Sequence, residues 1–494
     1  MTRERIHRIG MSACIVAGLL LVAASSGRAQ YLEDALRLGQ FGTGVGARAL
    51  GMGNAYTGVA SDFSAVYWNP AGLTQALHGE FFLGMSYLNM GDDGTLSSRD
   101  GLGNISLLGN PSSYTTTATN VNAVGVVYPV PVRRGSLVVA FGYDRRASFA
   151  SGVSFNGFNP GSSFIQTLVP DKQVFAPGDT ALLPWQLGLT DTANGKYRSV
   201  FNGRLTQLGN VIESGGLNDW SGALAVEVGK NLSIGITATL VSGSYRYDRD
   251  YHEQDRQHLF SYPFDLKDLK VTDFVDGDIT GANAKFGLMY TLPDRFRLGF
   301  GIRTPTSYNI REHYGQTLQS QFYTLDAAGH DLYGPFDYPG TVEYDVHTPW
   351  VFSVGASLIL RDLVLSGDLE YTDWTELEFA DAPSDLLALN PDFKTQLQGT
   401  ANLRAGAEYD LRDLGLRLRA GFIFNPSPFK GDPSSFDQKY VTGGLGIQLG
   451  ESAMLDLGYA HGWWQTYQTN YDPSSSVEEN IKTNTVLATL VYRF

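Results

Sequence analysis

Apolar and polar residues alternate with a period of two through much of this chain, and this pattern constrains the fold more than any other feature. In the clearest run, residues 414–424, leucine, alanine and phenylalanine alternate with glycine, arginine and isoleucine. Similar runs cover residues 363–371 and 296–303. A period of two places successive side chains on opposite faces of a β-strand. Several runs reach the roughly 9–11 residues that cross a bilayer at a tilt. The pattern therefore predicts an all-β fold, a transmembrane antiparallel β-barrel.

Short and long connections alternate along the chain. Tight turns are expected near residues 133–135, 229–231, 293–294, 361–362, 411–413 and 450–452. Long polar stretches, interpreted as loops, lie between them at residues 151–218, 243–281 and 309–341. Outer-membrane barrels combine short periplasmic turns with long outer loops and an even number of strands. Pairing strands to the turns predicts about 14 strands, with the tight turns facing the periplasm.

The N-terminus indicates export. Three arginines in the first eight residues precede an apolar run at 11–24, which ends near the small residues Gly27 and Ala29. This order predicts a secretory signal peptide over residues 1–29, because the apolar run is shorter than the roughly 20 residues of a spanning helix. Cys14 is the only cysteine, so the exported chain is expected to hold no disulfide and no thiolate metal site. These features predict a protein of the Gram-negative type of outer membrane.

A glycine-rich segment at residues 30–76 comes before the first expected strand. Seven glycines between positions 39 and 58 disfavour a long helix there, because each costs about 1 kcal/mol relative to alanine. A barrel of about 14 strands is wide enough to leak unless its lumen is filled. We therefore predict a compact N-terminal hatch, or plug, at 30–76 and a barrel at 77–494.

No motif in the sequence carries recognisable catalytic chemistry. The run Gly42-Thr43-Gly44-Val45-Gly46 lacks the third glycine and the strand–helix context of a dinucleotide site. No His-Glu-x-x-His or Gly-x-Ser-x-Gly motif occurs, although a triad scattered over several strands would leave no such signature. The loop acids lack the ligand spacing of an EF-hand. A net charge of −14 argues against nucleic acid. We expect no enzyme activity, no cofactor and no metal.

Five arginines on the expected lumen face are the candidate substrate contacts. They are Arg297, Arg303, Arg404, Arg417 and Arg419, and Glu408 shares their face. One interpretation is a network of ion pairs that fills the lumen. The other is a cationic step that guides a carboxylate headgroup, because arginine favours charge-assisted bonds to carboxylates.

The order of several short motifs resembles the FadL family of outer-membrane transporters. Residues 47–55 precede Trp68-Asn69-Pro70-Ala71-Gly72-Leu73, which is similar to the family's hatch with its Asn-Pro-Ala motif. The segments at 371–375, 419–422 and 425–428 and the terminal Phe494 resemble later family motifs. The resemblance implies a barrel of 14 strands with a plug whose pose Asn69, Pro70 and Ala71 fix. It also implies passive uptake of long-chain fatty acids or other hydrophobic small molecules, which leave sideways through the barrel wall.

An alternative is a PorV-like barrel that acts as a secretion or docking partner, since that group shares the N-terminal motif. The long 151–218 segment departs from the FadL pattern and leaves the substrate open. The expected partners are a hydrophobic small molecule, membrane lipid and lipopolysaccharide, and the expected state is a monomer.

Overall fold

The computed structural model describes residues 28–39, 42–99, 104–168, 183–193, 196–292 and 295–494. The expected signal peptide lies almost wholly outside these residues, as does the expected turn at 293–294. No helix in the described part is long and apolar enough to cross a membrane.

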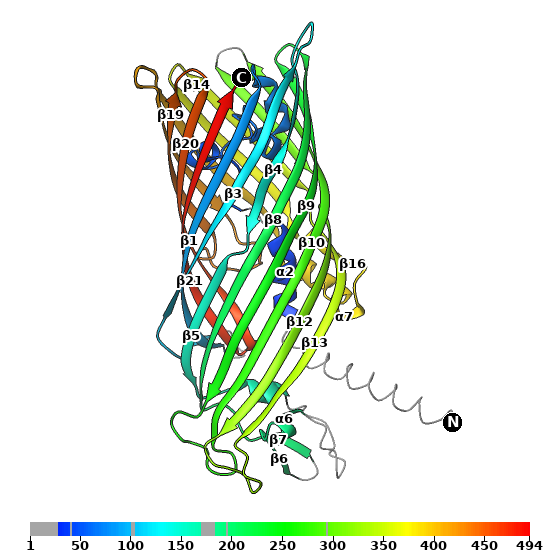
Figure 1. The fold of residues 1–494 in the computed structure, drawn as a ribbon, viewed down its shortest axis with the longest axis vertical. Coiled ribbons are helices and arrows are strands. Elements are labelled where there is room, and N and C mark those ends of the chain that lie inside the picture. Colours follow the sequence, from blue (N-terminus) through cyan, green and yellow to red (C-terminus); the bar gives the residue numbers. More distant parts are fainter. Residues whose placement is uncertain (1–27, 40–41, 100–103, 169–182, 194–195, 293–294) are drawn as a thin grey trace, which may run out of the picture.

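Fourteen antiparallel strands form one closed barrel (Figure 1). Ten of them are continuous: β1 (Glu80–Arg99), β3 (Ser112–Val130), β8 (Leu205–Gly229), β9 (Leu232–Gln254), β10 (Leu266–Leu292), β17 (Gly399–Leu411), β18 (Leu416–Asn425), β19 (Gln438–Leu449), β20 (Ala453–Asp472) and β21 (Ser475–Arg493). Four are interrupted: β4 (Leu137–Ser148) with β5 (Ser151–Asn159), β11 (Phe296–Arg303) with β12 (Ser307–Phe322), β14 (Val351–Leu360) with β13 (Leu332–His347), and β15 (Leu363–Asp373) with β16 (Glu378–Ala380). Pairing of β1 with β21 along their whole lengths closes the ring.

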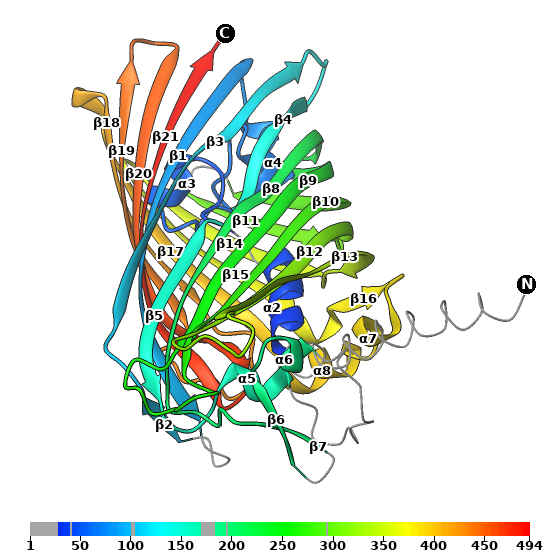
Figure 2. The ribbon, with the colours of Figure 1, turned by 60° about the horizontal axis from the view of Figure 1, so that its bottom comes forward.

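The smaller elements are not part of this ring of strands. The N-terminal segment contains α2 (Arg28–Gly39), α3 (Ala47–Gly51), α4 (Ala65–Trp68) and the 3-10 helix η1 (Pro70–Gln75). Connections hold β2 (Ile105–Leu107), α5 (Phe164–Leu168), α6 (Leu183–Gln186), β6 (Thr190–Ala193), β7 (Lys196–Ser199), η2 (Trp374–Glu376), α7 (Ser384–Leu387), α8 (Asn390–Gln396) and η3 (Arg412–Leu414). Figure 2 shows α3 and α4 within the barrel and α2 further down the lumen, toward the long connections.

The two ends of the barrel differ. Short connections join β3 to β4, β8 to β9, β14 to β15, β17 to β18 and β19 to β20 at one end, here called the turn end, where the C-terminus also lies (Figure 1). The opposite end, the loop end, carries the longer connections with α5, α6, β6 and β7. The described turns coincide with the expected positions.

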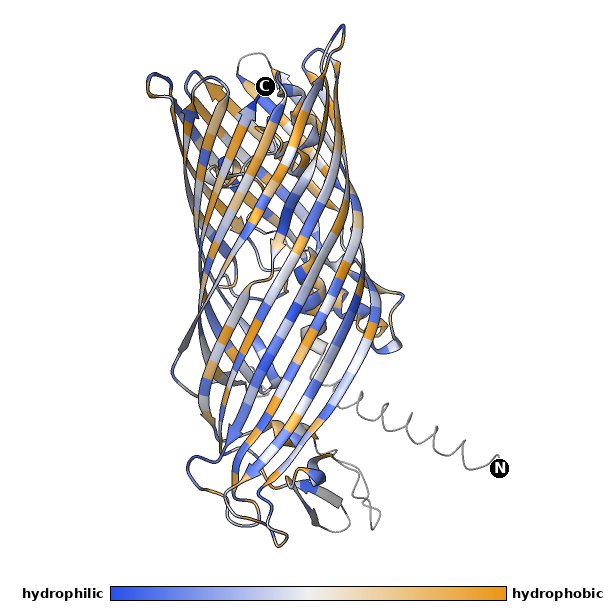
Figure 3. Cartoon of the chain, viewed as in Figure 1, coloured by the Kyte–Doolittle hydropathy of each residue, from blue (hydrophilic) through white to orange (hydrophobic). Residues whose placement is uncertain are grey.

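The three long polar stretches are only partly loops, which corrects the expectation from sequence. Residues 151–218 contain β5 and half of β8, residues 243–281 contain parts of β9 and β10, and residues 309–341 contain most of β12 and β13. The strands continue far past the apolar belt, where Figure 3 shows hydrophilic residues mixed along them. The outward residues of these strands are mostly polar, while apolar residues such as Tyr251, Leu269 and Val271 face inward. The outward apolar signal of a membrane strand is therefore lost although the strand persists.

Exposed aromatic residues mark the borders of the apolar belt. Near the turn end, Tyr128, Tyr290, Tyr409, Tyr492 and Phe494 face outward. Six to ten residues further along the strands, a second set of exposed aromatic residues contains Tyr87, Trp220, Tyr371 and Trp463. Aromatic girdles at both interfaces of an apolar band are typical of outer-membrane barrels. The turn-end half of the barrel therefore contains the membrane-spanning part of each strand.

The N-terminal segment sits on inward-facing glycines of the barrel. Ten strands each contribute one such glycine, at positions 125, 142, 235, 287, 299, 355, 406, 421, 444 and 458. A Cβ added at Gly406 would lie 2.1 Å from the carbonyl oxygen of Met52, and one at Gly299 would lie 2.2 Å from that of Thr57. Glycine is required where two backbones approach this closely. We call this ring of contacts the glycine seat.

The seat predicts which strand glycines tolerate a methyl group. Gly406→Ala is expected to lower the melting temperature of the barrel, because overpacking a filled interior costs about 1–3 kcal/mol. Gly367→Ala is the matched control. Gly367 lies on the neighbouring strand β15 and faces outward, and its Cβ would meet no atom closer than 3.8 Å. The two variants are compared by the temperature at which the folded, fast-migrating band is lost on a gel. Equal melting would show that the seat is not tightly packed.

Candidate functional site

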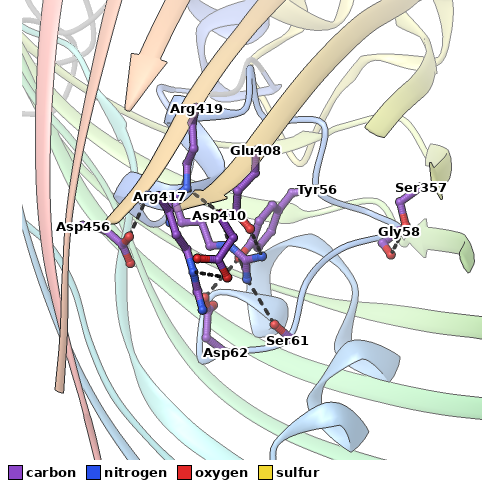
Figure 4. Close-up of polar contacts among 11 residues, drawn as sticks. Tyr56, Gly58, Ser61, Asp62, Ser357, Glu408, Asp410, Arg417, Arg419 and Asp456 are labelled. Atoms are coloured by element: carbon purple, nitrogen blue, oxygen red, sulfur yellow. Dashed lines mark hydrogen bonds and ion pairs between the residues drawn. The ribbon is translucent and has the colours of Figure 1, made fainter. Parts of the chain in front are cut away.

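An ion network ties the N-terminal segment to the barrel wall (Figure 4). Arg48 of α3 donates to both oxygens of Glu408 on β17, at 2.9 and 2.8 Å. Arg419 of β18 bonds the same carboxylate at 2.6 Å and lies 2.6 Å from Asp456 of β20. Arg48 also reaches Tyr56 at 3.3 Å. One buried carboxylate thus joins two guanidinium groups from the segment and from the wall.

Inward-facing side chains also satisfy the backbone of the segment. Asp368 on β15 accepts from the amides of Tyr56 and Thr57 at 2.8 and 2.7 Å. Asn122 on β3 accepts from the amide of Gly46 at 3.1 Å and donates to the carbonyl of Gly44 at 3.0 Å. A buried backbone group without a partner costs free energy comparable to a lost hydrogen bond. These side chains therefore hold in place an irregular segment whose backbone groups could not all find hydrogen-bond partners within the segment.

The Asn-Pro-Ala motif lies at the junction of α4 and η1. Asn69 is fully buried. Its amide donates to the carbonyls of Thr57 and Leu288 at 2.9 and 3.2 Å, and its side-chain oxygen accepts from the amide of Ala71 at 3.2 Å. Asn69 caps η1 in an extended conformation (φ −154°), and Pro70 follows at the first helical position, where its missing N–H is not needed. The motif therefore links two turns of the segment to β10.

The five candidate arginines face the N-terminal segment, and acids already engage several of them. Arg404 pairs with Glu370 at 2.7 Å, Arg417 lies 3.6 Å from Asp410, and Arg419 belongs to the network above. Arg297 interacts electrostatically with Arg48 and Tyr56. This arrangement resembles the ion-pair interpretation more than an open cationic step.

Arg303 lines a small polar cavity between α4 and the wall. Lys285, Glu370, Tyr67 and Trp68 line the same cavity. Lys285 donates to the carbonyl of Tyr67, and the guanidinium of Arg404 lies 5.6 Å from the ring of Trp68. Sequence reasoning missed Lys285 and Glu370. Their only signal was a polar position on an alternating strand, which does not separate a functional charge from a structural one.

A seam interrupts the hydrogen-bond ladder between β3 and its neighbour. β3 pairs with β4 only over the eight residues up to Val130, beginning at Ala123. It pairs with β5 at a single position, Ser112 with Ser154. Within the described strands, residues 113–122 of β3 have no ladder partner on this side. On the opposite edge of β3, residues 113–121 pair with β1 in one unbroken register from Asp93 to Met85.

The seam has a local cause on β8. Gly215 and Gly216 adopt φ values of 104° and 148°, which side-chain-bearing residues rarely adopt. The register between β4 and β8 shifts at Arg145, which donates to the carbonyl of Gly215 at 2.6 Å. β4 therefore bends away from β3 before β5 begins. On the lumen side, the amide of Gly42 donates to the carbonyl of Arg146 at 3.2 Å, next to the seam.

Beyond the glycine seat, helix α2 fills a part of the lumen that apolar side chains surround, here called the chamber. Leu32, Ala35, Leu36 and Leu38 are buried there. The barrel and the α7–α8 connection supply the surrounding side chains, among them Phe149, Leu217, Tyr308, Trp374, Phe379 and Phe393. Phe149 lies between β4 and β5, so the chamber adjoins the seam.

A second apolar cluster covers the loop end. Phe164, Ile165, Leu187 and Phe201 from the connection after β5 pack against Tyr251 and other strand residues. Glu253 on β9 holds this cap by accepting from the amide of Phe164 at 2.8 Å and from the side chain of Gln207 at 2.8 Å. The described part of the connection between β5 and β8 therefore packs as a cap on the strands.

Comparison with known proteins places this architecture in a family. The model of the family described as "Outer membrane protein transport protein (OMPP1/FadL/TodX)" matches residues 46–494. A FadL homologue from Pseudomonas aeruginosa has a similar structure, with a TM-score of 0.56 and 14% identity over 92% of this chain and 100% of that chain. The toluene transporter TodX from P. putida has a TM-score of 0.52 and 14% identity over 91% and 99%. A search of curated protein sequences gives no match.

The family match confirms the resemblance seen in the sequence, and the solved structures confirm the barrel of 14 strands. The family consists of transporters and not of enzymes. The chain belongs to the OMPP1/FadL/TodX family, and it is an outer-membrane β-barrel that transports hydrophobic compounds.

Proposed function

We propose that the N-terminal segment closes the lumen and that hydrophobic compounds leave the barrel through the seam beside β3. The segment acts as a hatch at the membrane level, with the turn end toward the periplasm and the loop end outside. A compound enters at the loop end, passes into the chamber around α2, and moves sideways between β3 and the β4–β5 break. The unpaired stretch 113–122 of β3, next to an apolar chamber, carries this proposal.

The glycine seat argues against a straight path through the barrel. Atoms of the hatch, backbone or the Phe63 ring, occupy the space beside inward glycines on ten strands, from β3 to β20. A route along the axis would require the hatch to leave these contacts together with the Glu408 network. The seam requires no such loss, because its ladder is already open. The inner end of the seam lies at the outer aromatic border of the apolar belt, where Thr119 of β3 pairs with Tyr87. A molecule that leaves there enters the bilayer from its edge, and its transfer into the apolar interior is favourable.

The proposed substrates are long-chain fatty acids or other hydrophobic small molecules. The structural relatives include a toluene transporter, so toluene is a suitable probe alongside a fatty acid. The further proposed partners are the surrounding lipid and lipopolysaccharide. We infer a monomer, because closure of β1 on β21 leaves no free strand edge that a second copy would have to cover.

The first test concerns the hatch. Glu408→Ala leaves Arg48 and Arg419 without their shared carboxylate, and breaking a buried pair costs about 3–5 kcal/mol. Loosening the hatch is expected to increase the entry of arabinose into proteoliposomes, measured by swelling. Asp362→Ala is the control, since its pair with Arg412 is exposed at a turn and such pairs contribute about 0–1 kcal/mol. If deletion of residues 30–76 also leaves arabinose entry unchanged, the segment is not a plug.

The second test concerns the seam. A Cβ at Gly152 of β5 would lie 3.2 Å from the hydroxyl of Thr116 on β3, which is close enough for a disulfide. We expect the double variant Thr116→Cys, Gly152→Cys to take up radiolabelled toluene slowly when oxidised and at the normal rate when reduced. Each single-cysteine variant controls for the substitutions. Equal uptake in both redox states, with the disulfide verified by mass spectrometry, would place the exit elsewhere.

A further inference from the structure

Four neighbouring strands of the barrel wall stop earlier than the strands on either side of them. On the side of the loop end, β15, β17, β18 and β19 stop at Asp373, Gly399, Asn425 and Gln438. Beyond these ends, residues 332–344 of β13 pair only with β12, and residues 464–472 of β20 pair only with β21. We call the gap in the ladder between these two strand edges the notch.

The notch begins at the outer border of the apolar belt. Asp373 follows closely on the exposed Tyr371, and Gln438 is next to Lys439, which pairs with the exposed Trp463. Aromatic rings in such girdles lie at the level where lipid headgroups meet the apolar interior. The notch therefore opens just outside the belt, in the layer that a compound reaches before it reaches the bilayer.

Side chains join opposite walls of the barrel near the tip of the loop end. Tyr471 of β20 accepts hydrogen bonds from Gln207 of β8 at 2.8 Å and from Asn159 of β5 at 3.3 Å. Arg249 of β9 donates to Asn470 of β20 at 2.7 Å. β20 and β8 are not neighbours in the ring, because β21, β1 and β3 lie between them. An entrance along the barrel axis would have to break these bonds and displace the cap described above.

The connection at residues 374–398, here called the lid, fills the notch beside β13. Figure 1 shows its elements β16 and α7 next to β13 at the side of the barrel. Four buried side chains of the lid belong to the apolar cluster around α2, namely Phe379, Leu386, Leu389 and Phe393. At this place the wall of the chamber consists mainly of packed side chains and not of a continuous hydrogen-bonded ladder.

The backbone of the lid is tied to the β18–β19 connection at one end and to β13 along a short stretch only. The amide of Lys430 donates to the carbonyl of Gln396 at 2.8 Å, and the amide of Gln398 donates to the carbonyl of Pro428 at 2.9 Å. On the side of β13, β16 pairs with residues 345–347 alone. A ladder of three residues has few hydrogen bonds to break. β16 and α7 can therefore separate from β13 while α8 keeps its place.

We propose that hydrophobic compounds enter the chamber sideways through the notch, when β16 and α7 move away from β13. The inference rests on the lateral path proposed above and names its entrance. The ring of Phe379 lies 5.8 Å from that of Tyr344 on β13 and 5.3 Å from that of Phe393 on α8. Movement of β16 thus opens the apolar cluster directly, and burial there favours apolar compounds over polar ones.

A disulfide between the lid and β13 tests this entrance. Asp345 and Ala380 are opposed in the short ladder. Opposed residues of an antiparallel pair have Cα atoms about 4.5–5.5 Å apart, which a disulfide can span. We expect cells with the double variant Asp345→Cys, Ala380→Cys to lose most of their protein-dependent uptake of radiolabelled toluene when the pair is oxidised, and to regain it on reduction. Normal uptake with the disulfide verified by mass spectrometry would overturn the proposal.

The matched control links β13 to its other neighbour. Asn309 of β12 is also opposed to Asp345, so the double variant Asn309→Cys, Asp345→Cys shares one substitution with the test. Its disulfide joins two strands that a long ladder already holds together, and uptake should be the same in both redox states. If oxidation slows the control as much as the test variant, the loss of uptake is not due to the lid and the proposal fails.

A second variant gives a reading if the test disulfide does not form. Phe379→Ala removes the ring between Tyr344 and Phe393, so the lid should open more readily. We expect faster toluene uptake at concentrations far below saturation, where entry sets the rate. Phe300→Ala is the control, because Phe300 lies on β11 and is exposed on the outside of the barrel. Uptake by Phe379→Ala at or below the rate of this control would count against the lid as the entrance.

The seam variant Thr116→Cys, Gly152→Cys separates the two proposals. If its disulfide stops uptake while the disulfide between positions 345 and 380 does not, only the proposed entrance fails. If neither disulfide changes uptake, the lateral path itself is wrong.

Discussion

The rest of the structure depends on close packing between two backbones, because the N-terminal segment lies on inward glycines of the barrel. Ten strands each have a glycine, and so no side chain, at the level of the hatch. A segment of irregular structure therefore fits where a barrel of this width would otherwise hold water. The polar groups of that segment are then satisfied by inward side chains such as Asp368 and Asn122. The filled lumen and the buried ion network follow from this packing, which is also the basis of the lateral exit proposed above.

Much of the fold was predictable, because the membrane imposes a pattern on the sequence. Within the apolar belt, outward residues must be apolar and inward residues polar or small. The period-two runs at 296–303 and 363–371 were therefore readable from the sequence, and they form β11 and β15. The same reasoning failed beyond the belt. The polar stretch at 243–281 was interpreted as a loop, yet it belongs to strands of 23 and 27 residues. Water on the outer face removes the apolar signal, while the ladder continues to satisfy the backbone.

The candidate site was less predictable, because it depends on which residues meet across the lumen. The sequence placed Asn69, Pro70 and Ala71 in the hatch, and the structure shows Asn69 bridging to β10. It could not show that Arg48 joins Arg419 on Glu408, because Arg48 lies 360 positions before Glu408. The seam was invisible for another reason. It results from positive φ angles at Gly215 and Gly216 on a neighbouring strand, and two glycines among 57 carry no mark of their role.

The contacts of Ala47 couple the two ends of the chain. Its amide donates to the hydroxyl of Thr489 on β21 at 3.0 Å, and its carbonyl lies against Gly458 on β20. β21 also pairs with β1 to complete the ring. Closure of the barrel and placement of the N-terminal segment therefore depend on the same two strands. The segment can make these contacts only when β20 and β21 are in place.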